Sequence, residues 1–199
     1  MSMFMFWQMN RVNALRGGTE MTKNVLVIST SLRKNSNSEV LADSFARGAE
    51  EAGHHVEKIT LKDKKIAFCK GCMACMKLKA CVMKDDAIEI AAKMHDAEVI
   101  AFASPIYYYE MSGQMKTLLD RANSLYDSDY KFTDIYMLTA AAEDDEHAPD
   151  RAVGGLTGWI DCYGKSSLKG HLFCGGVTDA RDIEGNSKLQ EAYEMGKGV

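Results

Sequence analysis

The chain has 199 residues, of which 46% are hydrophobic and 26% charged, and its formal net charge is −4. This length supports one well-packed core and leaves little room for two complete domains. The mildly acidic balance, without a basic stripe, argues against a nucleic-acid partner. No stretch approaches the roughly 20 continuous apolar residues of a membrane-spanning helix, so we expect no membrane partner either.

The amino-terminal residues differ from the rest of the chain. Residues 1–7 are apolar and rich in methionine but have no basic residue before them, which is a poor match to a secretory signal. Met21 stands shortly before the first convincing strand. We therefore expect an extension at 1–21, interpreted as a mis-assigned start or a disordered tail, and one folded domain at 22–199. The alternative is an arm that exchanges onto a partner subunit.

The folded part alternates between expected strands and helices. Apolar runs predict strands at 24–30, 55–61, 98–104, 132–140 and 170–175. Amphipathic segments predict helices that begin at Ser38, Asp85 and Ser112, and further helices over 150–162 and 184–196. Alternation of this kind predicts a doubly wound α/β fold, with a five-stranded parallel sheet and helices on both faces. Ligands of such sheets bind beyond the carboxyl ends of the strands, so the loops after strands one, three and four are the candidate site.

The loop after the first strand is rich in hydroxyl and amide side chains. It ends where a helix begins, and the unpaired N–H groups and positive dipole of a helix start favour a phosphate. The loop has neither a G-x-G-x-x-G nor a G-x-x-x-x-G-K-[ST] pattern, which argues against a dinucleotide or nucleoside-triphosphate loop. The candidate phosphate ligands are Ser31, Arg33, Ser36, Asn37 and Ser38. For any single serine, the alternative is a helix cap.

Three consecutive tyrosines, from Tyr107 to Tyr109, follow the third strand, which we expect to end at Pro105. Flat aromatic faces outside a regular element suit a flat ring. The alternative is a dimer interface, where tyrosine is also enriched.

The loop after the fourth strand begins with small residues that would let a ring approach the backbone, and Thr139 and Ala140 are its candidate contacts. We assign no catalytic acid or base, and we interpret His147 in this loop as a surface residue.

Cys69, Cys72, Cys75 and Cys81 form a C-x2-C-x2-C-x5-C pattern. This compact spacing suits a [4Fe–4S] cluster, whereas structural zinc more often uses two separated pairs. The alternative is a loop of bare thiols. Thiols crowded in this way indicate a reducing compartment, so we expect a cytoplasmic protein. The two remaining cysteines, at 162 and 174, are interpreted as buried small hydrophobic residues.

The segment from Ser31 to Ser38 resembles the phosphate loop of the NADPH-dependent FMN reductase family, although members often carry glycine where Ser36 stands. The segment from Pro105 to Arg121 resembles the flavin-ring loop of that family. The cysteine spacing is similar to that of its iron–sulfur flavoprotein branch.

The resemblance implies a flavodoxin-like fold with strand order 2-1-3-4-5, FMN as cofactor and NAD(P)H as co-substrate. It implies that Pro105, Ile106, Tyr107 and Tyr108 contact the flavin. Lys116, Asp120 and Arg121 also match the family pattern, but we interpret them as a solvated, salt-bridged helix face.

Two functions follow from this resemblance. The first is an oxidoreductase that takes hydride from NAD(P)H and reduces a quinone, nitro compound, flavin or similar acceptor. The alternative is an electron carrier with FMN and a [4Fe–4S] cluster, fed by a ferredoxin-like donor. The resemblance further implies a homodimer or tetramer.

Overall fold

The computed structural model describes residues 21–199, so the expected amino-terminal extension lies outside the described residues except for Met21. The strands are β1 (Asn24–Ser29), β2 (His55–Thr60), β3 (Val99–Tyr107), β4 (Glu110–Met111), β5 (Asp134–Ala140) and β6 (Ser167–Cys174). The helices are α2 (Asn37–Glu51), α3 (Ala74–Leu78), α4 (Ala87–Asp96), α5 (Gly113–Arg121), the 3₁₀ helix η2 (Ala122–Leu125), α6 (Asp150–Ile160) and α7 (Lys188–Lys197). No helix within residues 21–199 has the length and hydropathy of a membrane span.

The central sheet has the strand order β2-β1-β3-β5-β6, and every neighbouring pair along this path is parallel. Numbered among themselves, these long strands have the order 2-1-3-4-5, so the predicted flavodoxin-like topology is confirmed. The short strand β4 is an addition that the sequence did not suggest. It pairs antiparallel with the end of β3.

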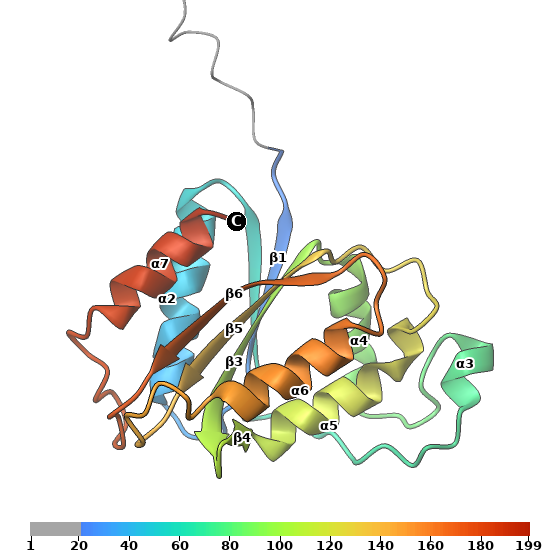
Figure 1. Ribbon diagram of the computed structural model, residues 1–199. Coiled ribbons are helices and arrows are strands. Elements are labelled where there is room, and N and C mark those ends of the chain that lie inside the picture. The colour runs from blue at the N-terminus through green and yellow to red at the C-terminus, as the bar shows by residue number, and fades with distance from the viewer. Residues whose placement is uncertain (1–20) are drawn as a thin grey trace, which may run out of the picture.

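Helices cover both faces of the sheet and create two cores (Figure 1). Successive strand residues point to opposite faces, so Val25 and Val27 pack under α2 and α7, whereas Leu26 and Ile28 pack under α4, α5 and α6. This two-sided burial explains why the first strand is an uninterrupted apolar run. Because these strands are parallel, the loops that lead from them into helices lie at one edge of the sheet.

Two of the predicted start and stop signals were wrong. Ser36, and not Ser38, caps α2, because its Oγ accepts a hydrogen bond from the Glu39 N–H at 3.2 Å. Pro105 does not end β3, because the strand stays paired to β5, with Pro105 opposite Ala140, and continues to Tyr107. A proline's fixed φ is compatible with an extended chain, so the missing N–H is the only loss.

Other boundaries moved by a few residues. The helix expected from Asp85 begins at Ala87, the last strand begins at Ser167 and the final helix begins at Lys188. The cysteine-rich segment, expected as loop alone, contains the short helix α3.

The helices α2 and α7 touch backbone to backbone through two glycines. A Cβ atom at Gly48 would lie 2.0 Å from the Tyr193 carbonyl oxygen, and one at Gly196 would lie 2.0 Å from the Phe45 carbonyl oxygen. Neither neighbour is a flexible side chain, so neither can move aside cheaply.

We expect Gly48→Ala to lower the free energy of unfolding by about 3 kcal/mol, the upper end of the cost of overpacking. Gly154→Ala is the matched control, because nothing lies within 4 Å of a Cβ there and the site is an exposed helix position. The control should gain about 0.5–1 kcal/mol from reduced backbone entropy in the unfolded chain. Urea denaturation measures both, and equal stabilities of the two variants would contradict the close helix contact.

Candidate functional site

A pocket of about 200 Å³ lies beyond the carboxyl ends of the parallel strands. It brings together most of the residues that the sequence indicated: Ser31, Arg33, Ser36, Asn37, Ser38, Pro105, Ile106, Tyr107 and Ala140. Tyr108 and Thr139 do not line it. Sequence reasoning missed Ala141, Ala142, Val177 and Thr178, which also line it. Val177 and Thr178 follow β6, one loop beyond those that the strand order singled out.

The turn between β1 and α2 is built to receive an anion. Ser31, Ser36 and Ser38 are buried against protein atoms, yet all three line the pocket. The N–H groups of Asn37 and Ser38, in the first turn of α2, have no hydrogen-bond acceptor within residues 21–199. Free N–H groups at a helix start, serine hydroxyls and a nearby guanidinium are the donor set that a phosphate requires, so the residues present fit the phosphate of FMN.

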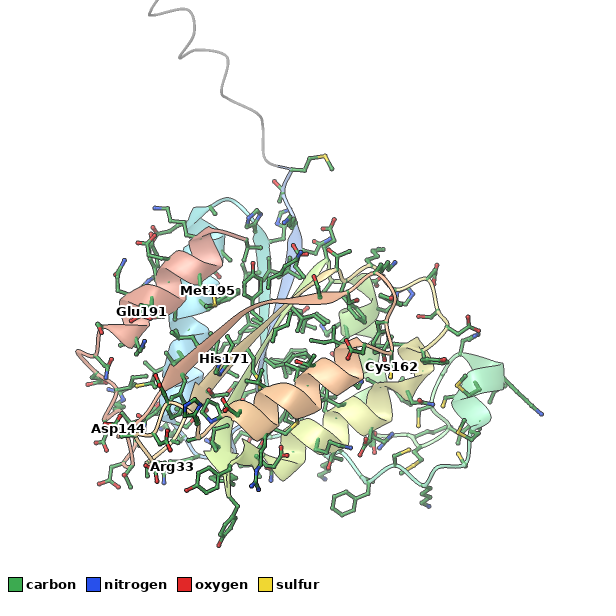
Figure 2. The ribbon with its side chains drawn as sticks, in the orientation of Figure 1. Arg33, Asp144, Cys162, His171, Glu191 and Met195 are labelled. Atoms are coloured by element: carbon green, nitrogen blue, oxygen red, sulfur yellow. The ribbon has the colours of Figure 1, made fainter. Side chains whose placement is uncertain are left out.

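Arg33 and Asn37 also tie the loop after β6 to this turn. The Arg33 guanidinium donates to the Thr178 carbonyl oxygen at 2.6 Å, and the Asn37 side-chain amide donates to the Asp179 carbonyl oxygen at 2.9 Å. The Asn37 amide oxygen in turn accepts from the Ile183 N–H at 3.3 Å. The Asn37 side chain is therefore used within the fold, and its backbone N–H is what it offers to a ligand. Figure 2 shows Arg33 at the end of the sheet toward which β5 and β6 point.

The tyrosines form a tight hairpin turn between β3 and β4. Tyr107 pairs with Glu110, and the two residues between them, Tyr108 and Tyr109, have φ values of 51° and 65°. Two-residue hairpin loops with positive φ normally use asparagine or glycine, because a large side chain is strained there. Strain of this kind is characteristic of functional sites. Tyr107 lines the pocket, whereas Tyr108 is 96% exposed.

Thr139 lies behind the pocket instead of in it. It is fully buried, and its hydroxyl donates to the Leu172 carbonyl oxygen at 3.3 Å and lies 3.0 Å from Nε2 of His171. Burial lowers the pKa of His171, so this imidazole is neutral at neutral pH. Both partners lie in the neighbouring strand β6, so the Thr139 hydroxyl is bonded within the sheet and does not face the pocket.

The cysteine loop is anchored by Arg121, which is wholly buried instead of solvated as we expected. Its guanidinium makes two hydrogen bonds, of 2.6 and 2.8 Å, to the Asp85 carboxylate and one of 2.7 Å to the Ala67 carbonyl oxygen. It also donates to the Met83 carbonyl oxygen at 3.2 Å and lies 3.4 Å from the Cys81 sulfur. The other two residues of the expected salt-bridged face are confirmed: Lys116 and Asp120 form an exposed ion pair at 2.6 Å.

The four cysteines of the motif are not gathered. Cys69 and Cys72 are exposed, Cys75 and Cys81 are half-buried, and no group of three or more His, Cys, Asp or Glu side chains within residues 21–199 is arranged to hold a metal ion. Four thiols fit an iron–sulfur cluster by ligand type, but their placement here does not. The Asn123 side-chain amide donates to the Cys75 sulfur at 3.2 Å.

The two remaining cysteines differ in exposure. Cys174 is buried, as predicted, and burial raises the pKa of its thiol. The prediction for Cys162 was wrong, because it is exposed and lines a pocket of about 530 Å³ together with Cys69 and Asn123. His147 is an exposed residue paired with Asp150 at 3.1 Å, as expected of a surface histidine.

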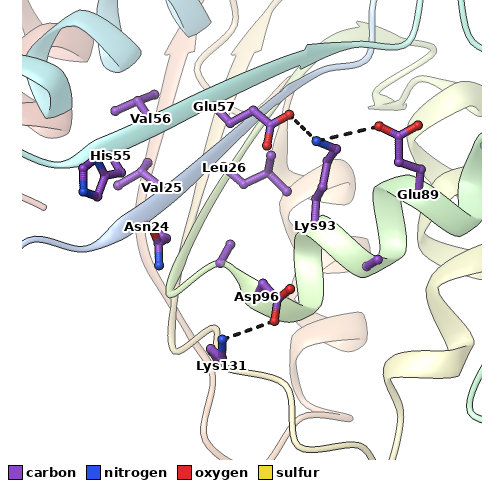
Figure 3. Close-up of a pocket in the computed structure, with 12 residues that line it drawn as sticks. Asn24, Val25, Leu26, His55, Val56, Glu57, Glu89, Lys93, Asp96 and Lys131 are labelled. Atoms are coloured by element: carbon purple, nitrogen blue, oxygen red, sulfur yellow. Dashed lines mark hydrogen bonds and ion pairs between the residues drawn. The ribbon is translucent and has the colours of Figure 1, made fainter.

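A larger pocket, of about 570 Å³, lies at the amino ends of β1 and β2 (Figure 3). Its charged side chains are paired with one another: Lys93 with Glu57 at 2.5 Å and Glu89 at 3.7 Å, and Lys131 with Asp96 at 3.2 Å. It lies at the edge opposite to the one where doubly wound sheets bind ligands. We therefore assign the candidate site to the smaller pocket.

The strand order, the pocket beyond the carboxyl strand ends and the hydroxyl-rich turn before α2 define a flavodoxin-like α/β protein with a candidate anion site. The chain belongs to the NADPH-dependent FMN reductase family, whose model matches residues 23–163.

An iron–sulfur flavoprotein of Archaeoglobus fulgidus is 36% identical over 91 residues, which are 46% of this chain and 41% of that protein. An iron–sulfur flavoprotein of Methanosarcina thermophila is 26% identical over 171 residues, 85% of this chain and 90% of that protein. The chain spans about half the length of three curated Archaeoglobus relatives that it matches.

Among solved structures, an NAD(P)H:quinone oxidoreductase from Methanothermobacter marburgensis is similar with a TM-score of 0.73 at 17% identity. The alignment covers 89% of this chain and 96% of that chain. At this identity the similarity shows the shared fold.

The buried pair of Arg121 and Asp85 generates a pH prediction. The hydrogen bonds from Arg121 lower the pKa of Asp85 below its ordinary value of 3.8. The stabilisation is therefore complete above that value and is lost as the pH falls through the lowered pKa. We expect Asp85→Asn to cost about 3 kcal/mol of unfolding free energy at pH 7, since it leaves a buried charge unpaired.

Urea denaturation at several pH values checks this. The difference in unfolding free energy between the natural chain and Asp85→Asn should become smaller as the pH falls below the ordinary pKa of an aspartate. Asp120→Asn removes the neighbouring exposed pair and is the control, with an expected cost below about 1 kcal/mol. A pH-independent gap would contradict the role of the Asp85 charge.

Proposed function

We propose that the chain is an FMN-dependent oxidoreductase that takes hydride from NAD(P)H and reduces a quinone, nitro compound, flavin or similar small acceptor. The observation that supports this best is the single pocket that joins an anion-binding turn to an exposed tyrosine hairpin. Membership in the NADPH-dependent FMN reductase family and the fold shared with an NAD(P)H:quinone oxidoreductase also support it.

The turn before α2 would hold the FMN phosphate. The N–H groups of Asn37 and Ser38 point out of the first turn of α2, and the serine hydroxyls can rotate to donate to the phosphate oxygens. Arg33 supplies a positive charge from a position fixed by Thr178. These donors are present in the folded chain, so little ordering is needed when the cofactor binds.

The flavin ring would lie against the hairpin and the small residues after β5. Pro105, Ile106 and Tyr107 offer backbone and ring contacts on one side, and the alanines at 140–142 allow close approach on the other. FMN, when bound, supplies the hydride chemistry, so the chain needs no acid or base of its own. The exposed side chain of Tyr108 would cover the flavin or pack on a second subunit of a homodimer or tetramer.

The second candidate function is an electron carrier with FMN and a [4Fe–4S] cluster, fed by a ferredoxin-like donor. The C-x2-C-x2-C-x5-C spacing and the curated relatives named iron–sulfur flavoprotein favour it. Four thiols within thirteen residues also suit a reducing compartment, so we place the protein in the cytoplasm under either function.

The visible spectrum of protein purified without oxygen separates the two functions when iron and sulfide are assayed on the same sample. Flavin bands that NAD(P)H bleaches, without iron, would support the oxidoreductase. A broad brown absorption with about four irons and four sulfides per chain would support the carrier. Absence of flavin after addition of FMN would refute both.

The phosphate assignment predicts a selective loss of FMN affinity. Arg33→Ala and Ser38→Ala should raise the dissociation constant of FMN roughly 10- to 100-fold, the equivalent of one charge-assisted hydrogen bond. Riboflavin, which has no phosphate, should bind the natural and variant chains equally. Arg181→Ala is the control, because Arg181 pairs with Glu184 on the surface and does not line the pocket. Fluorescence titration measures each constant, and an equal loss for riboflavin and FMN would overturn the assignment.

A further inference from the structure

Positive charge is concentrated in one segment of the chain, from Lys62 to Lys84, which we call the lysine segment. It contains seven lysines and one aspartate, a net charge of +6, although the whole chain carries −4. The acidic balance of the whole chain conceals this concentration. Our prediction that the chain has no basic stripe was therefore wrong for this segment.

The charges of the lysine segment are available to a partner. Six of the seven lysines are exposed, and within residues 21–199 only Lys79 has an ion-pair partner, Asp127 at 3.2 Å. The part of the segment from Ala67 to Met83 is fixed at both ends, because Arg121 donates to their carbonyl oxygens at 2.7 and 3.2 Å. Helix α3, in the middle of this part, lies at the outer margin of the molecule, away from the sheet (Figure 1). The folded chain thus presents this positive charge on a surface whose ends need no further ordering.

Apolar side chains are exposed between these lysines. The large ones are Phe68, Met73, Leu78 and Val82. Phe68, which is 81% exposed, borders a pocket of about 350 Å³ together with Lys62 and Lys64. Apolar side chains that are gathered in one exposed segment and rimmed by polar ones mark an interaction site with a protein or a membrane.

The composition of the lysine segment favours a lipid surface as its partner. Protein interfaces are enriched in arginine and depleted in lysine, and arginine also makes the forked contacts to nucleic-acid phosphates and bases. The lysine segment contains no arginine. Clustered lysines are attracted to anionic lipid headgroups, and apolar side chains beside them can enter the boundary between headgroups and acyl chains.

We propose that the lysine segment docks the protein on the surface of an anionic lipid bilayer. The lysines contact the headgroups, and Phe68 and Leu78 enter the acyl boundary. We expected no membrane partner because the sequence has no spanning segment, but docking on the surface of a bilayer needs none. The attachment is reversible, because a few apolar side chains and clustered charges bind far more weakly than a spanning helix.

Sedimentation with lipid vesicles tests the proposal on FMN-loaded, full-length protein. The natural chain should bind vesicles of phosphatidylcholine mixed with phosphatidylglycerol but not vesicles of phosphatidylcholine alone, and added salt should weaken the binding. Lys70→Gln, Lys77→Gln and Lys84→Gln together should weaken it about 100-fold, since each lysine near an anionic surface contributes roughly fivefold.

Phe68 separates docking through this surface from general attraction between charges. Phe68→Ser keeps every charge but removes the apolar ring, so it should weaken vesicle binding roughly tenfold. Phe68→Trp restores an aromatic ring at the same place and should bind like the natural chain.

Lys131→Gln, Lys169→Gln and Lys197→Gln together are the matched control, because they remove the same charge from exposed lysines outside the segment. This variant should bind vesicles nearly as well as the natural chain, and an equal loss in the two triple variants would overturn the proposal. Absence of binding to the anionic vesicles would also overturn it, in favour of an acidic protein as the partner. The vesicles hold no electron acceptor, so neither result depends on the proposed oxidoreductase function.

Discussion

A buried hydroxyl bridge ties the loop after β1 to strand β3 and to the start of α5, beside the candidate pocket. Thr30 donates its N–H and its hydroxyl proton to the Ala103 carbonyl oxygen, at 2.8 and 3.0 Å, and its oxygen lies 3.0 Å from the Ser112 hydroxyl. Because the Thr30 hydroxyl proton is already donated to Ala103, Ser112 must be the donor to Thr30. The Ser112 oxygen also caps α5 by accepting from the Met115 N–H. The loop after β1, strand β3 and the start of α5 are thus joined through fully buried groups.

The helix α5 links the two candidate sites. Ser112 at its amino end is bonded to Thr30 beside the candidate pocket, and Arg121 at its carboxyl end anchors the cysteine loop. The helix has nine residues, so its ends lie about 13 Å apart at the usual rise of 1.5 Å per residue. A helix of this length separates the candidate pocket from the cysteine loop while tying the segments beside both to one element. The two segments are fixed by different interactions. Neutral hydroxyl and N–H groups hold the loop after β1 beside the candidate pocket, and a buried ion pair holds the cysteine loop.

The predictions that failed share a physical cause. Lys116, Asp120 and Arg121 form a charged pattern typical of a solvated helix face. Arg121 is nevertheless buried, because the earlier segments at Ala67 and Asp85 lie against it and accept its hydrogen bonds. Cys162 follows the end of α6 and borders a pocket that Cys69, more than ninety residues earlier, also lines, so the sequence around it does not show that it is exposed. Pro105 stays within β3 because it pairs with Ala140 of β5, which lies 35 residues later in the chain. In each case a partner distant in sequence decided the outcome.

The sequence alone determined the order of strands and helices, because buried parallel strands require continuous apolar runs and their helices require amphipathic ones. It also indicated the phosphate turn, since hydroxyl groups before a helix start form an anion site through local geometry. Tertiary structure decided what depends on long-range contact: that Val177 and Thr178 line the pocket while Thr139 is used within the sheet, and that Tyr108 sits at a strained hairpin tip. It also decided which sulfurs receive hydrogen bonds from outside the cysteine loop. Within residues 21–199 these are Cys75 and Cys81, whose donors Asn123 and Arg121 belong to η2 and α5.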